Sequence, residues 1–204
     1  MKLGQKYGVW LLLLFHIIGY ILFIQDAENA KLTYMNIWLC GTVVFFSEKL
    51  EPRAFIPLII IFGGGYLAEL SGVHTGVLFG EYQYGEALGL PLFGIPIVMG
   101  MNWYATVVTS SSLAIRIVKN KWLQALLAAA LCTGLDILIE PVAIKYDFWA
   151  WGGGDIPIQN YIAWFGFSFI FALVYVFNTR VKNNTATGLW FIWLAFFLLL
   201  NFTG

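Results

Sequence analysis

Three carboxylic acids lie inside long apolar stretches of the chain: Glu69, Asp136 and Glu140. An ionisable side chain at the centre of a helix in hydrocarbon costs at least about 2.5 kcal/mol, so such residues indicate functional sites by default. Asp136 and Glu140 are four residues apart and fall on one face of a helix. In a milder interpretation, the acids only bridge neighbouring helices or reach the outer interface. That interpretation applies best to Glu140, which lies only a turn from a loop.

Polar and aromatic side chains of two further apolar stretches are expected at the same depth. Asn102 opens one stretch and Asn160 opens another, with Trp103 and Trp164 beside them. Polar groups that four helices contribute at one level favour a shared cavity over scattered surface positions. We therefore expect these four residues to line a binding site around the acids.

The longest connection, from residue 72 to residue 93, is rich in glycine and tyrosine. We expect its Tyr82 and Tyr84 to fold over the mouth of the cavity. Pro141 directly follows Glu140 and predicts a break in the helix at this point, because proline removes a backbone donor and clashes with the preceding turn.

These residue types suit acid catalysis on an alkene. A carboxyl in a poorly solvated site favours its neutral form, and two neighbouring carboxyls resist ionising together, so one can act as a general acid. Protonating an alkene makes a carbocation, which the faces of Trp, Tyr and Phe rings stabilise. We expect Asp136 to donate the proton, with Glu69 or Glu140 as its partner and as the base for water. Asn102 and Asn160 would orient them.

Other chemistries lack their residues. The sequence has no Ser/His/Asp constellation, His and Cys metal cluster, phosphate-binding loop or nucleotide fingerprint, so it predicts no metal and no cofactor. A retinal Schiff base is excluded because the seventh apolar stretch has no lysine. The spacing of Asp136 and Glu140 is similar to the Mg-diphosphate motifs of membrane prenyltransferases. Those motifs need a second acidic motif and cationic groups, and only Lys145 is nearby.

Composition sets the fold class that must position these residues. The 204 residues are 60% hydrophobic and only 11% charged, which excludes an ordinary soluble domain with about 25% charged residues. Stretches approaching the roughly 20 apolar residues of a membrane span predict one domain over residues 1–204, an all-α bundle of about seven transmembrane helices. Their approximate ranges are 7–24, 33–46, 55–71, 94–115, 122–143, 158–177 and 187–202. The balanced charge excludes nucleic acid as a partner.

Positive charges test this count, because Lys and Arg accumulate in cytoplasmic loops. With the N-terminus in the cytoplasm and the C-terminus outside, nine cations fall on the inner side and two on the outer side. The inner nine are Lys2, Lys6, Lys49, Arg53, Arg116, Lys119, Lys121, Arg180 and Lys182; the outer two are Lys31 and Lys145.

Several motifs, taken together, are similar to one known family. They are Glu69–Gly89 (ELSGVHTGVLFGEYQYGEALG), Gly94–Pro96, Asn102–Trp103, Asp136–Pro141 (DILIEP), Trp149–Trp151 (WAW) and Ile156–Trp164 (IPIQNYIAW). In order and spacing they resemble the membrane carotenoid-biosynthesis hydratase family over roughly half of the chain. One departure is Glu140, where many relatives are expected to have Asp; a carboxylate is retained with a reach longer by one methylene.

The resemblance implies a lyase that adds water across the terminal C1=C2 bond of an acyclic carotenoid end, of the γ-carotene or lycopene type, to give a tertiary alcohol. It implies no cofactor, and it implies a carotenoid and water as substrates in the cytoplasmic (inner) membrane of a bacterium. The lipid bilayer and other enzymes of the carotenoid pathway are the expected partners.

Two other functions fit the same residues. A small membrane lycopene cyclase begins with the same protonation but lets an internal double bond capture the cation. A transporter or carotenoid-binding protein would use the acids as a proton relay and leave the pigment unchanged.

Overall fold

The computed structural model describes residues 3–179 and 182–203. Within these residues the chain forms seven α-helices, which confirms the predicted all-α class and the predicted number of helices. They are α1 (Leu3–Gln25), α2 (Thr33–Ser47), α3 (Phe55–Thr75), α4 (Val98–Ile117), α5 (Lys121–Lys145), α6 (Ile158–Asn178) and α7 (Asn184–Phe202). The short 3-10 helices η1 (Ala27–Leu32) and η2 (Pro52–Ala54) flank α2 and α3.

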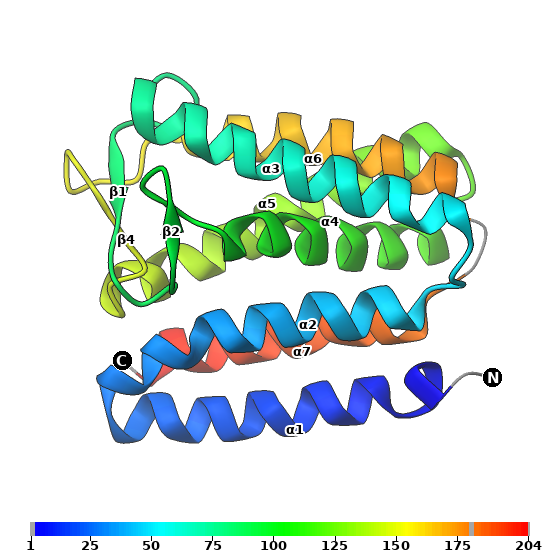
Figure 1. The fold of residues 1–204 in the computed structure, drawn as a ribbon, viewed down its shortest axis with the longest axis horizontal. Helices are drawn as coiled ribbons and strands as arrows, with labels where there is room; N and C mark the ends of the chain where they lie inside the picture. The colour runs from blue at the N-terminus through cyan, green and yellow to red at the C-terminus, as the bar shows by residue number, and fades with distance from the viewer. Residues whose placement is uncertain (1–2, 180–181, 204) are drawn as a thin grey trace.

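Successive helices run in opposite directions along the long axis, so the two termini lie at opposite ends of the molecule (Figure 1). In that view α3 and α6 form the upper layer, α4 and α5 the middle, α2 and α7 the next layer down, and α1 the lowest. The α3–α4 and α5–α6 connections lie at one end of the bundle and carry the short strands, and this end also holds the predicted site residues.

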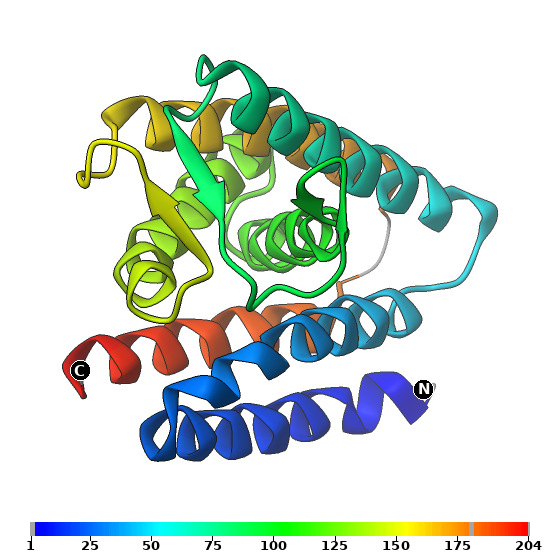
Figure 2. The ribbon, with the colours of Figure 1, turned by 60° about the vertical axis from the view of Figure 1, so that its left-hand side comes forward.

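Helix α4 is the centre of the bundle. It packs against α2, α3, α5, α6 and α7, and Figure 2 shows it in green with the other helices around it. Every residue from Val98 to Ala114 is buried except Asn102. Because protein surrounds it on nearly all sides, α4 can carry hydroxyl side chains that a lipid-facing helix would not tolerate.

The outer helices present apolar side chains to their surroundings. Five of them are long and apolar enough to cross a membrane: those covering Tyr7–Gln25, Pro52–Thr75, Lys121–Lys145, Ile158–Asn178 and Asn184–Phe202. Large hydrophobic residues such as Trp10, Ile59 and Ile162 are more than 60% exposed. An exposed apolar surface of this kind is stable in lipid and not in water, so the fold is that of an integral membrane protein.

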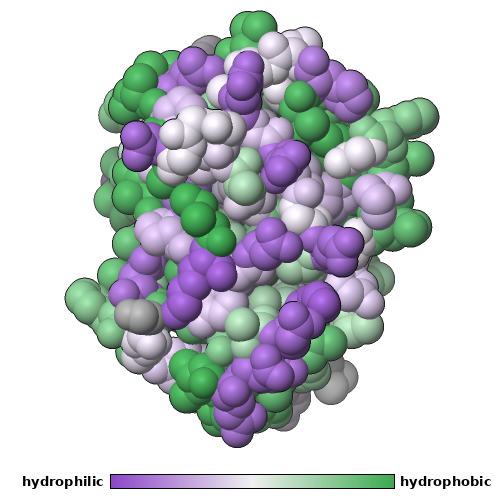
Figure 3. Space-filling model, turned by 90° about the vertical axis from the view of Figure 1, so that its left-hand side faces the viewer, coloured by the Kyte–Doolittle hydropathy of each residue, from purple (hydrophilic) through white to green (hydrophobic). Residues whose placement is uncertain are grey.

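The two ends of the bundle differ in charge. Hydrophilic side chains gather on the end that carries the strands (Figure 3); among the exposed residues there are Asp26, Glu81, Glu86, Asp147 and Asp155, with only Lys31 and Lys145 as cations. At the other end, Lys49, Arg53, Arg116, Lys119, Lys121 and Lys182 lie in or directly beside the connections, and Lys6 belongs to the first turn of α1. Lys2 and Arg180 lie outside the described residues. This distribution agrees with the predicted cytoplasmic N-terminus, and the orientation in the membrane stays a prediction.

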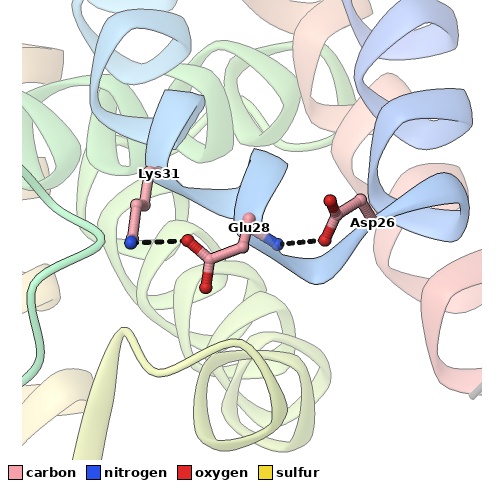
Figure 4. A network of polar contacts seen from close by, with 3 residues as sticks. All are labelled: Asp26, Glu28 and Lys31. Atoms are coloured by element: carbon pink, nitrogen blue, oxygen red, sulfur yellow. Dashed lines mark hydrogen bonds and ion pairs between the residues drawn. The ribbon is translucent and has the colours of Figure 1, made fainter.

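The turn between α1 and α2 is fastened at the polar end. Asp26 caps η1 by accepting a hydrogen bond from the backbone N–H of Glu28 at 3.0 Å, and Lys31 pairs with Glu28 at 2.6 Å (Figure 4). Both partners of the ion pair are mostly exposed, so solvent screens the attraction and the pair contributes little to stability. The role of the segment is to close the short connection between two antiparallel helices.

One expectation about helix α5 is wrong. The predicted break at Pro141 is absent, because α5 continues unbroken to Lys145. Proline leaves the carbonyl four residues earlier without its usual donor, yet neighbouring helices and local adjustments hold such helices together inside membranes. Here α5 packs against α4, α6 and α7, and that packing keeps the residues on both sides of Pro141 helical.

Glycines in α3 admit the aromatic core of the site. A Cβ atom added to Gly65 would lie 2.4 Å from the ring of Trp103, and one added to Gly64 would lie 2.8 Å from Phe171. Neighbouring Gly63 has no heavy atom within 4 Å of the same position. Gly64 and Gly65 therefore allow the close packing that small residues permit between membrane helices, whereas Gly63 does not take part in it.

The variant Gly65→Ala should displace Trp103 and lower the free energy of unfolding by about 1–3 kcal/mol, as overpacking of a dense core does. Gly63→Ala is the matched control, with open space at the added methyl group. Thermal unfolding of both variants in the same detergent checks the difference, and equal melting temperatures would contradict it.

Candidate active site

The three predicted acids come together near the strand-bearing end, each almost fully buried. Glu69 of α3 is 3% exposed and accepts three hydrogen bonds. Its Oε2 accepts hydrogen bonds from the hydroxyls of Tyr82 at 2.5 Å and Tyr84 at 2.7 Å. Its Oε1 accepts one from the indole N–H of Trp103 at 2.7 Å. The three donors satisfy the carboxyl and offset part of the cost of burying it.

Asp136 and Glu140 share one amide. Both residues are 1% exposed. Nδ2 of Asn160, in the first turn of α6, donates to Oδ2 of Asp136 at 3.0 Å and to Oε1 of Glu140 at 3.1 Å. Glu140 also accepts at Oε2 from the indole N–H groups of Trp149 (3.0 Å) and Trp151 (2.9 Å). The helical spacing thus placed both acids on one face, as predicted.

A two-stranded antiparallel sheet aims the aromatic donors at the acids. Strand β1 (Tyr82–Tyr84), from the connection after α3, pairs with β4 (Trp149–Trp151), which follows α5. Tyr82 lies opposite Trp151, and Tyr84 opposite Trp149. Because side chains alternate between the faces of a strand, all four aromatic residues share the inner face. The small outer sheet of β2 (Pro91–Leu92) and β3 (Ile95–Pro96) leads the chain back into α4.

Aromatic rings also form the wall behind Glu69. Trp103 of α4 and Trp164 of α6 stack with ring centroids 3.9 Å apart and planes 12° from parallel. Phe79, Phe167 and Phe171 pack around Trp103 with centroids 5.7–6.5 Å from it. The predicted site residues Trp103 and Trp164 thus lie in the site as one stacked pair.

A small hollow lies between Glu69 and Glu140. Its volume is about 20 Å³, and its lining includes Glu69, Glu140, Asn160, Trp149 and Met99. A space of roughly 10–15 Å³ holds one water molecule when polar partners are present. The hollow therefore fits a single water, and it is too small for any part of a larger molecule. Asp136 does not line it and reaches it only through Asn160 and Glu140.

A much larger apolar cavity, of about 370 Å³, adjoins the hollow. Met99 and Trp149 line both spaces. Asn102 was expected to orient the acids, and this expectation is wrong. Asn102 lines the large cavity instead, and the described donors to the acids are other residues. Adjacent residues on a helix point about 100° apart, so with Trp103 turned toward Glu69, Asn102 faces the opposite compartment.

Every described hydrogen-bond donor to the three carboxyls is an uncharged group. Lys145 lies over the ring of Tyr146 instead. Burial, and next the adjacent Glu69 carboxyl, raise the pKa of Tyr82 and Tyr84 above the ordinary value of a phenol. Both hydroxyls therefore keep their protons and act as donors over the physiological pH range.

The sequence interpretation missed three residues of the site: Trp149, Trp151 and Met99. The alternating patterns of residues 82–84 and 149–151 were the available signal, because a period of two is typical of a strand. For Met99, which separates the two spaces, the sequence carries no distinguishing signal.

It also missed a fourth buried acid, at the opposite end of the bundle. Oε1 of Glu48 accepts hydrogen bonds from Tyr175 at 2.6 Å and Asn183 at 2.7 Å. These bonds tie the end of α2 to α6 and to the N-cap of α7. Charged neighbours in the sequence made Glu48 resemble an ordinary loop residue.

The fold and the site define a helical membrane protein with a buried acid centre beside an apolar cavity. A family model described as carotenoid biosynthesis protein matches residues 30–204. Since the match covers most of the chain, the protein belongs to the carotenoid biosynthesis protein family, which confirms the resemblance seen in the sequence.

One named relative is bisanhydrobacterioruberin hydratase of Haloarcula japonica, 28% identical over 122 residues. The alignment covers 56% of this chain and 42% of the relative, so the chain spans less than half of the relative's length. No solved structure matches the chain.

Asn160→Leu should lower the free energy of unfolding by about 1–3 kcal/mol, because it removes the donor that two buried carboxyls share. Asn178→Leu, at the other end of α6, is the control, since Asn178 donates only to the carbonyl of Val174 on its own helix. Melting temperatures measured in detergent test the pair. A loss at Asn178 as large as that at Asn160 would show that the amide bridge does not stabilise the site.

Proposed function

We propose that this protein is a carotenoid hydratase, which adds water across the terminal C1=C2 bond of an acyclic carotenoid end such as that of lycopene or γ-carotene. One observation carries the proposal: two of three buried carboxyls, all with neutral donors, line a hollow the size of one water molecule, beside a large apolar cavity. Membership of the carotenoid biosynthesis family and the likeness to a named hydratase support it.

The geometry suggests a division of roles among the acids. Asp136 has one described donor, so it is the carboxyl least stabilised as an anion and the one best able to store a proton. Glu140 lines the hollow, and Asp136 lies one turn away against the same amide, so repulsion between the two carboxyls keeps one proton on the pair, which Glu140 gives to the substrate. Glu69 has three donors and shares none of them with another carboxyl, so it is assigned the carboxylate form and serves as the base for water. Asp136 thereby holds the proton, and Glu140 is the group that touches the substrate.

The reaction balances without a cofactor. The proton adds to C2 of the alkene, and the positive charge falls on the tertiary carbon C1. The water in the hollow forms the new C–O bond at C1 and gives one proton to Glu69. Proton transfer from Glu69 back to the Asp136–Glu140 pair restores the enzyme, and the product is a tertiary alcohol heavier than the substrate by one water.

Aromatic faces stabilise the cation between these steps. Trp149 lies against both the hollow and the cavity, and Tyr82, Trp151 and Trp164 line the hollow. A cation held over a desolvated aromatic face gains about 2 kcal/mol. We place the protein in the cytoplasmic membrane, where other enzymes of the carotenoid pathway would supply and consume its pigments.

Asp136→Asn and Glu140→Gln should each lower turnover by roughly 10²-fold or more, the contribution of a general acid. The assay is expression in a bacterium that accumulates lycopene, followed by chromatography and mass spectrometry of the extracted pigments. The unmodified protein should give a more polar product heavier by one water, with an unchanged chromophore.

Glu48→Gln is the matched control, because the hydrogen bonds that Tyr175 and Asn183 donate to Glu48 both reach Oε1, an atom that glutamine keeps. It should retain turnover within about threefold of the unmodified protein, in line with the small effect of changes away from the chemistry. Full activity of stably folded Asp136→Asn would overturn the assignment of Asp136. An isomer of unchanged mass would indicate a cyclase, and unaltered pigment would indicate a transport or binding protein.

A further inference from the structure

The 370 Å³ cavity lies between the α1–α2–α7 side of the bundle and α4 and α5. Figure 1 shows these helices as neighbouring layers that run side by side. The volume is within the roughly 300–1,000 Å³ typical of small-molecule sites. Its lining is mainly apolar, with contributions from Gly19 of α1, Cys40 of α2 and Trp193 of α7.

One side of the cavity faces lipid. Four of its lining residues are exposed apolar side chains: Phe15 and Ile18 of α1 at 44% each, Leu32 at 46% and Met35 of α2 at 54%. Phe148 and Trp193, deeper in, are almost fully buried. The cavity therefore runs from the membrane-facing groove between α1 and α2 into the protein.

The inner end of the cavity meets the acid site at two side chains. Met99 is 2% exposed and Trp149 is 9% exposed, and both line the cavity and the hollow. Trp149 is fixed by its hydrogen bond to Glu140, whereas Met99 has a flexible, unbranched side chain that moves between rotamers at low cost. The two residues form a partition between an apolar space and a water-sized polar one.

The α4 wall of the cavity offers polar atoms as well. Thr106 is 1% exposed, and its hydroxyl has no hydrogen-bond partner among the described residues. Asn102, one turn earlier on the same face, also lines the cavity. A buried hydroxyl without a partner is costly unless something binds it, so this wall suits a ligand that gains a hydroxyl group.

We infer that this cavity binds the end of an acyclic isoprenoid chain that enters sideways from the bilayer between α1 and α2, and that Met99 moves aside to let the terminal double bond reach the acids. The inference rests on the proposed function, because it adds the substrate site and route for the same reaction. The rest of a long polyene stays in the lipid. After hydration, the new hydroxyl group hydrogen-bonds to Asn102 and Thr106 as the product leaves through the cavity.

Gly19 allows the cavity to be filled without disturbing the helix. A Cβ atom there lies no closer than 3.8 Å to any described side chain, at Phe196, so a larger side chain projects into the space. Gly19→Phe is the test variant, and Gly19→Leu is a milder second version. Gly166→Phe is the matched control, since Gly166 is an exposed helical glycine with no atom within 4 Å of its added Cβ.

Each variant is made in two backgrounds and expressed in a bacterium that accumulates lycopene. In the Asp136→Asn background, the measurement is the lycopene retained per protein after purification; in the unmodified background, it is the hydrated product. Gly19→Phe should lower both by about tenfold or more, and Gly166→Phe should lower neither. Equal melting temperatures of the two glycine variants show that folding is retained.

The outcomes separate the cavity from the reaction. If Gly19→Phe and Gly19→Leu retain lycopene and form product like the unmodified protein, the cavity proposal is overturned while the hydratase function stands. If retention depends on Gly19 but no protein forms the hydrated product, the cavity is supported and the proposed reaction fails.

The partition has its own test. Met99→Phe places a stiffer ring between the two spaces, so lycopene retention should stay within about twofold while product formation falls by about tenfold. A parallel fall in retention and product would contradict a gate at Met99, because it would mean that this residue only contributes to binding.

Discussion

Burial of three carboxyl groups in a membrane protein is the constraint on which the rest of this structure depends. Charged groups in a medium of low dielectric are stable only when hydrogen bonds satisfy them. The described donors are all neutral: two phenols, three indoles and one amide. Neutral donors stabilise the carboxyls without fixing them as ion pairs, so protons can still move among them.

Much of the fold serves to deliver these donors. Gly65 lets α4 approach closely enough for Trp103 to reach Glu69. The pairing of β1 with β4 turns four aromatic side chains inward, and the first turn of α6 places Asn160 between two acids. The same elements leave only a water-sized volume at the centre, and a separate apolar cavity lies beside it. In the proposed reaction, water and hydrocarbon approach the acids from these two different spaces.

The helices and the acid positions were predictable because they depend on local patterns. Apolar length gave seven helices, and the spacing of Asp136 and Glu140 gave their common face. The strand pairing was not predictable, because β1 and β4 come from connections far apart in the chain. Asn102 was expected to orient the acids but does not contact them, since the sequence did not indicate that its neighbour Trp103 faces the acids instead. The break expected at Pro141 failed because tertiary packing overrides a local preference.

The most direct test of the account is to run the reaction in deuterated water and then return the extracted product to ordinary water. Proton delivery from the carboxyls to C2, followed by capture of the C1 cation, predicts a hydrated product that retains one deuterium bound to carbon. A hydrated product with no carbon-bound deuterium would contradict protonation of the alkene as the source of the activity.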